Sequence, residues 1–188
     1  TGHGYSDAPA FSNGFGGPDG LKYLRSLPFV DQTRIGMEGH SMGGWAIQAA
    51  AATTPDAYQS MVLTGSSTGT LGVPEGTAEY PRNLLLVFSL FDEFSELMWG
   101  AAVPADIVET AKLKTLFDTD ETVISGQLYG DVKSGNARML RMPAVTHPGD
   151  HLSVDTVAAT VAWFSKTLQS HTLLQDRDQI WFWKELAN

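Results

Sequence analysis

The feature that most constrains the fold is the run from Leu84 to Leu90, which is apolar at every position except Ser89. A strand without a polar face must be buried on both sides, as central strands of parallel sheets are. Elsewhere, short apolar runs alternate with segments whose apolar residues recur at helical spacing, a pattern typical of a parallel sheet covered by helices. The expected strands are Arg34 to Glu38, Gln59 to Thr64, Leu84 to Leu90 and Arg138 to Val145, and the expected helices are Pro18 to Leu27, Met42 to Thr53, Ala105 to Phe117 and Ser153 to Leu168. We therefore predict an α/β fold with a mostly parallel sheet and helices on both faces.

Composition excludes several classes of protein. The formal net charge of -9 argues against nucleic acid as a partner, because phosphate binding needs clustered lysine and arginine. The chain has no cysteine, so disulfides, thiolate nucleophiles and zinc–thiolate sites are excluded. No apolar run approaches the roughly 20 residues that a membrane-spanning helix needs. These observations favour a soluble globular domain, and they say little about its substrate or its cellular compartment.

The segment Gly39-His40-Ser41-Met42-Gly43 has the pattern G-x-S-x-G and lies between a predicted strand and an Ala-rich predicted helix. In that context the chain turns sharply and exposes the serine hydroxyl. Small residues two before and two after the serine let strand and helix approach closely. We predict Ser41 as a nucleophile and the backbone N–H of Met42, at the helix N-terminus, as an oxyanion donor. The alternative is a tight turn that contains a spectator serine.

The stretch Asp31 to Ala46, DQTRIGMEGHSMGGWA, resembles the nucleophile turn of α/β-hydrolases, most closely the dienelactone-hydrolase-like and esterase-like members. Gly2 to Ser6 resembles a G-H-G-x-S segment of the same superfamily. The resemblance extends to about Leu168. It implies an α/β-hydrolase fold and a serine hydrolase whose catalytic residues follow in the order Ser, acid, His. The implied reaction is cleavage of an ester, thioester or related acyl bond through an acyl-enzyme.

The resemblance implies that the catalytic acid follows the strand two after the nucleophile strand, which is Leu84 to Leu90. Asp92 is the preferred candidate there, and Glu93 is the alternative. The role of the acid is to accept the imidazole N–H and stabilise the imidazolium. The competing interpretation is that both carboxylates only begin a helix, where negative charge is favourable.

The resemblance places the catalytic histidine between the last core strand and the last helix. That loop contains His147 and His151. We prefer His151, because the helix that Ser153 is expected to cap follows it directly and Pro148-Gly149 resembles the family approach to the histidine. His147 is the alternative. The H-x-x-x-H spacing also suits a metal, but the proline and glycine between the histidines break any helix, so we predict no metal site. The implied serine-hydrolase reaction requires no cofactor.

The resemblance also implies that the chain begins in the middle of the fold, as the C-terminal two-thirds of a catalytic domain. The strands expected before Gly2 include the one whose loop supplies a second oxyanion donor. A sheet without them has an unpaired edge, which invites association. We therefore expect either a completing N-terminal segment or a homo-oligomer as partner.

The expected domain covers residues 1–170, with 94–135 as a cap or wall of the site and 171–188 as a separate aromatic tail. Thr122 to Tyr129 is either a hairpin strand or part of that cap. The tail contains Trp181-Phe182-Trp183-Lys184, and aromatic residues beside lysine are frequent at membrane interfaces. Some bacterial α/β-hydrolase-like proteins carry transmembrane helices beside the hydrolase domain, and the tail resembles such a junction. The alternative is an amphipathic helix packed on the domain or in a dimer.

Two further functions compete with the acyl hydrolase. A peptidase of the prolyl-oligopeptidase type has a similar catalytic domain, with a gating domain upstream. A non-catalytic α/β-hydrolase-like domain used for binding in a membrane-linked protein would have the same fold without the reaction.

Overall fold

The computed structural model describes residues 5–6, 13–170 and 174–183. At its centre is a five-stranded sheet with the order β1-β2-β3-β5-β4. Four strands are parallel, and β4 runs antiparallel to β5. The strands are β1 Gly36–His40, β2 Ser60–Thr64, β3 Leu84–Val87, β4 Leu128–Tyr129 and β5 Arg138–Arg141. The chain therefore has the predicted α/β architecture.

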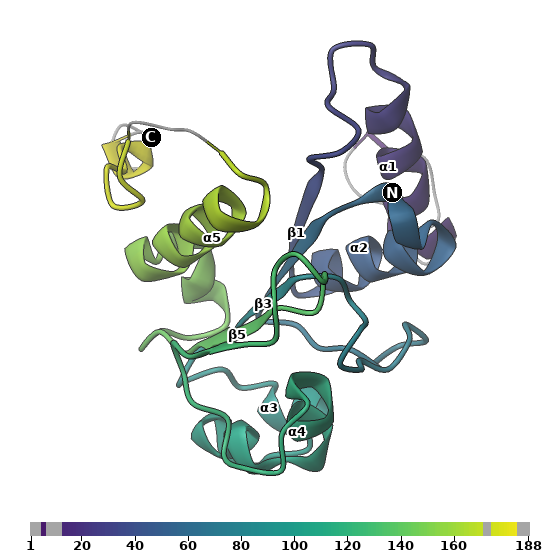
Figure 1. Ribbon diagram of the computed structural model, residues 1–188. Helices are drawn as coiled ribbons and strands as arrows, with labels where there is room; N and C mark the ends of the chain where they lie inside the picture. The colour runs from purple at the N-terminus through teal and green to yellow at the C-terminus, as the bar shows by residue number, and fades with distance from the viewer. Residues whose placement is uncertain (1–4, 7–12, 171–173, 184–188) are drawn as a thin grey trace.

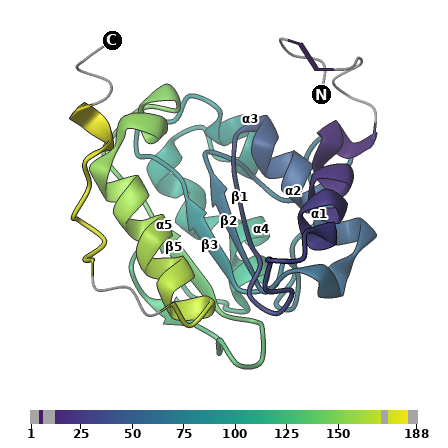
Figure 2. The same ribbon diagram turned by 90° about the horizontal axis from the view of Figure 1, so that it is seen from above.

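Helices cover both faces of the sheet (Figures 1 and 2). The helices α1, α2, α3 and α4 contribute to one large apolar cluster on one face, whereas α5 packs on the other face against β2 and β3. The α-helices are α1 Gly17–Ser26, α2 Met42–Thr53, α3 Ser95–Trp99, α4 Ala111–Phe117 and α5 Val154–Thr167. Short 3-10 segments are η1 Asn13–Gly16, η2 Pro55–Ala57, η3 Pro104–Glu109 and η4 Pro148–Leu152.

The burial of β3 explains its apolar sequence. All four of its residues are fully buried, and alternate side chains enter different clusters. Leu84 and Leu86 belong to the large cluster on the α2 face, whereas Leu85 and Val87 contact the smaller cluster around Trp163 of α5. This two-residue alternation is the strand period, and it confirms a central strand buried on both sides over the first four residues of the predicted run.

Capping residues decide where two of the predicted helices begin. Thr110 accepts a hydrogen bond from the Leu113 N–H at 3.3 Å, so α4 begins at Ala111 and the residues before it form the separate segment η3. The predicted helix Ala105 to Phe117 is therefore divided in two. Ser153 accepts from the Thr156 N–H at 3.2 Å, which confirms the expected cap of α5.

The two ends of the chain are only partly described. Gly2 to Gly4 of the G-H-G-x-S segment and several tail residues lie outside the described residues. In the described part of the tail, Arg177 pairs with Asp155 at 2.7 Å and the Gln179 side chain donates to the Val154 carbonyl at 2.9 Å. Among the described residues, none of the helices combines the length and apolar character needed to cross a membrane.

Candidate active site

Ser41 occupies the sharp turn between β1 and α2 with a strained backbone. Its φ is 54° and its ψ is -119°, a conformation that side-chain-bearing residues rarely adopt and that is found mostly at functional turns. The turn is fixed to the neighbouring strand, because the Ser41 N–H donates to the Thr64 carbonyl at 2.9 Å. The Ser66 hydroxyl donates to the Ser41 carbonyl, also at 2.9 Å.

The glycines around Ser41 are required to different extents. A Cβ on Gly39 would lie 2.3 Å from the backbone carbonyl carbon of Gly43, and a Cβ on Gly44 would lie 2.3 Å from the Ser66 hydroxyl. A Cβ on Gly43 would meet no atom within 4 Å. The close approach of strand and helix therefore depends on Gly39 and Gly44, so the second glycine of the G-x-S-x-G pattern is not needed for the packing we expected of it.

Met42 is the first residue of α2, so its N–H belongs to the first helical turn and has no partner within the helix. Met42 directly follows Ser41 in the chain. In a substrate attacked by the Ser41 hydroxyl, the N–H of that next residue can stabilise the negative charge on the former carbonyl oxygen.

Asp92 and His147 are in direct contact. The His147 Nδ1 lies 2.8 Å from the Asp92 Oδ2, and both side chains are buried. The contact follows from the register of β3 and β5. Their hydrogen bonds continue beyond the regular strands, and Phe91 forms a parallel bridge with Thr146. The next residues along the two chains, Asp92 and His147, are therefore brought together.

His151 does not contact Asp92, so the expectation that it does is corrected. Its side chain is exposed and packs on His40, with ring centroids 4.0 Å apart. Pro148 begins the 3-10 segment η4, in which His151 lies one turn beyond His147. That turn carries His151 away from the end of β3. The Pro148-Gly149 sequence thus follows the Asp92-contacting histidine instead of preceding it.

Other groups hold His147 from several sides. The His147 N–H lies 3.4 Å from the Glu93 Oε2, and the Phe94 ring meets the imidazole edge-on with centroids 4.8 Å apart. From the opposite strand, the His40 Nε2–H donates to the His147 carbonyl at 3.0 Å. Burial lowers the pKa of His40, which favours the neutral form of this side chain. Glu93 therefore contacts the backbone of the histidine, not its ring.

Gly65 links the histidine to the serine turn. It directly follows Thr64, whose carbonyl accepts from the Ser41 N–H. A Cβ on Gly65 would lie 2.9 Å from the His147 Nδ1. The φ of Gly65 is 50°, so this position favours glycine for its conformation as well as for its space. Ser41 and His147 thus flank the same end of β2.

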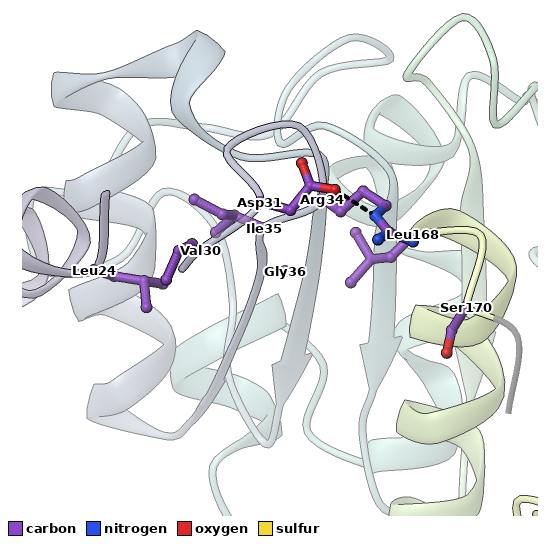
Figure 3. Close-up of a pocket in the computed structure, with 8 residues that line it drawn as sticks. All are labelled: Leu24, Val30, Asp31, Arg34, Ile35, Gly36, Leu168 and Ser170. Atoms are coloured by element: carbon purple, nitrogen blue, oxygen red, sulfur yellow. Dashed lines mark hydrogen bonds and ion pairs between the residues drawn. The ribbon is translucent and has the colours of Figure 1, made fainter. Parts of the chain in front are cut away.

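One cavity lies far from these groups. A cavity of about 590 Å³ lies at the first residue of β1, between Leu24 and Val30 on one side and Leu168 and Ser170 on the other (Figure 3). Ser41 follows the last residue of β1, roughly 16 Å away at the rise of a strand. A second cavity, about 570 Å³, is lined by residues 90–93, 95 and 102–105 beside Asp92. Neither cavity is lined by Ser41 or His147.

Sequence reasoning did not identify Gly65, Ser89 and Asp150 as parts of this region. All three become significant only through contacts between segments that are far apart in the chain. Asp150 is buried, accepts a hydrogen bond from the Ser89 hydroxyl and lies three residues after His147. The one available signal was its place in the same short loop as both histidines.

Residues 18–75 match the model of the prolyl oligopeptidase family. The matched stretch contains the Ser41 turn but neither Asp92 nor His147. A comparison with curated proteins finds no match. The family match supports a serine hydrolase of the α/β-hydrolase superfamily, and it does not distinguish an ester from a peptide as the substrate.

Proposed function

We propose that this chain is a serine hydrolase that cleaves an ester, thioester or related acyl bond. The observation that carries the proposal is the 2.8 Å contact between Asp92 and His147 at the sheet end that bears the strained Ser41 turn. A buried carboxylate that accepts the Nδ1–H of an imidazole leaves Nε2 free as a base. A serine beside such a base can act as a nucleophile.

In the proposed reaction, the Ser41 oxygen bonds to the substrate carbonyl carbon while its proton passes to the His147 Nε2. Asp92 keeps the ring in the required tautomer and stabilises the imidazolium. The Met42 N–H stabilises the oxyanion. The imidazolium returns the proton to the leaving group as the substrate bond breaks. Water, deprotonated by His147, then releases the acyl group from Ser41.

A peptidase is the second candidate, and the family match over residues 18–75 favours it. Both candidates use the same nucleophile, so the substrate decides between them. We would first test whether Ser41 reacts with a fluorophosphonate probe, with Ser41→Ala as control. The purified chain would then be assayed with short p-nitrophenyl esters and with a proline-containing peptide p-nitroanilide. Faster turnover of the peptide than of the esters would show that the chain is a peptidase and not an ester hydrolase. A Ser41 that does not react with the probe would favour a non-catalytic binding domain.

We also propose that β1 pairs with a further strand, from an additional segment or a second copy of the chain. Within the described residues no strand pairs with the outer side of β1. The cavity in Figure 3 lies beside that side, next to Gly36. An unpaired edge promotes association. Light scattering on the 188-residue chain should therefore show concentration-dependent association, and a monodisperse monomer with full ester activity would contradict this part of the proposal.

A further inference from the structure

Asp150 is a buried carboxyl group that the proposed reaction does not yet use. It lies in η4, three residues after His147, and is 1% exposed. The Ser89 hydroxyl, at the end of β3, donates a hydrogen bond to its Oδ1. Its Oδ2 is buried without a hydrogen-bond partner among the described residues. A buried carboxyl oxygen without a donor costs free energy, and such groups in folded proteins often have a functional role.

The free oxygen of Asp150 lies beside Gly65, as does the imidazole of His147. A Cβ on Gly65 would lie 3.1 Å from the Asp150 Oδ2 and 2.9 Å from the His147 Nδ1. Both atoms therefore approach the same bare side of Gly65. The Nδ1 is also the atom that contacts Asp92. Two carboxyl groups, Asp92 and Asp150, thus lie close to one imidazole.

Several titratable groups surround Asp150. From β1, the His40 Nε2 lies 4.0 Å from the Asp150 Oδ2, and Glu38 lines the same cavity of about 290 Å³. Burial chiefly, together with the Asp92 charge, raises the pKa of Asp150 to about 6, although the Ser89 hydrogen bond and the charges of His147 and His151 lower it. Burial also raises the pKa of Glu38.

We propose that Asp150 is a positioning residue of the hydrolase site: its carboxylate, held by Ser89, fixes the turn after His147 and stabilises the charged imidazolium from the side of Gly65. The proposal rests on the proposed role of His147 as the base. Asp92 fixes the ring through a hydrogen bond, whereas Asp150 acts through its charge and through the backbone of η4. The site then works best when Asp150 is ionised.

The first test is the pH dependence of kcat/KM for a p-nitrophenyl ester. In the unmodified chain the loss of the His147 proton is required for activity, and the loss of the Asp150 proton raises kcat/KM about tenfold further. The acid limb of the logarithmic plot should therefore have a slope above one over the pH range in which Asp150 ionises. Asp150→Asn should reduce that slope to one and lower kcat/KM at pH 8 about tenfold. Ser89→Ala removes a donor to the carboxylate and should move the acid limb to higher pH. The control is Asp155→Asn, an exposed aspartate on α5 whose loss should leave the profile unchanged.

The second test does not depend on hydrolysis. The ring protons of His147 would be followed by NMR as a function of pH in the unmodified chain, Asp150→Asn and Ser89→Ala. Loss of the Asp150 charge should move the titration midpoint of His147 to lower pH, because the imidazolium loses a stabilising neighbour. An unchanged midpoint in folded Asp150→Asn, or a slope of one in the unmodified chain, would overturn the proposal. A shifted midpoint in a chain without any hydrolytic activity would refute the proposed function alone. If Asp150→Asn does not fold, Ser89→Ala tests the proposal alone. An acid limb that does not move to higher pH in that variant would overturn it.

Discussion

The serine turn and the histidine turn meet at the same end of the sheet, yet they are held by different forces. The serine turn depends on backbone hydrogen bonds and on the absence of side chains at Gly39 and Gly44. The histidine turn is held by side chains: Asp92 on the ring, His40 on the carbonyl and Ser89 on Asp150. Steric contacts therefore fix the Ser41 turn, whereas hydrogen bonds and charged groups fix the His147 turn.

This difference predicts which changes each turn tolerates. Added volume should damage the serine turn, because its close contacts involve backbone atoms that cannot rotate away. Changes of charge or pH should act on the histidine turn, because its partners titrate or carry charge.

The largest effect is expected from Gly39→Ala. The added Cβ would lie 2.3 Å from the backbone of Gly43, so β1 and α2 must separate. We expect a loss of stability of about 1–3 kcal/mol, typical of overpacking, and loss of fluorophosphonate labelling of Ser41. The matched control is Gly43→Ala, whose Cβ meets no atom and which should gain up to about 1 kcal/mol as a helical residue. Equal thermal stability of the two variants would contradict the steric account.

Asp92→Asn should have the next largest effect. The amide can hold the ring of His147 in the wrong tautomer without disturbing the fold, and we expect kcat to fall by about 10⁴. Glu93→Gln is the matched control, because Glu93 reaches only the His147 backbone at 3.4 Å. Its kcat should change by less than about tenfold. Steady-state ester kinetics measure both, and a greater loss in Glu93→Gln would make Glu93 the catalytic acid.

A smaller effect is expected on the pH dependence of stability. The pKa of Asp150 is raised to about 6 in the folded chain, so its contribution to stability is fully present below about pH 4 and is lost as the pH rises through 6. Asn cannot ionise, so Asp150→Asn does not lose stability as the pH rises. Its free energy of unfolding, measured with urea, should exceed that of the unmodified chain by up to about 3 kcal/mol at pH 7.5 and should equal it at pH 4. If the variant and the unmodified chain differed in free energy of unfolding by the same amount at pH 7.5 and pH 4, folding would not raise the pKa of Asp150, which would contradict this prediction.

The sequence allowed the serine turn to be predicted because its determinants are local. Strand, glycines, serine and helix follow one another within residues 34–53, and α2 has the predicted bounds. The buried strand at Leu84 was equally predictable, since burial on both faces leaves an apolar run. Asp92 could be proposed from its place just past that strand.

The partner of Asp92 could not be chosen in the same way. It depends on the register between β3 and β5, which brings Phe91 opposite Thr146. No residue in the loop reveals that register, and Pro148-Gly149 suggested the wrong histidine. Gly65 and Ser89 were equally hidden, because each contacts a residue far from it in the chain.

The most direct test of the account compares His147→Ala with His151→Ala in ester kinetics, with thermal unfolding as a check on the fold. Loss of the base should lower kcat by about 10⁴ to 10⁶ in His147→Ala. His151→Ala should lose less than about tenfold, because the exposed ring contacts His40 and not Asp92. A large loss in folded His151→Ala, with activity retained in folded His147→Ala, would contradict the assignment of His147 as the base.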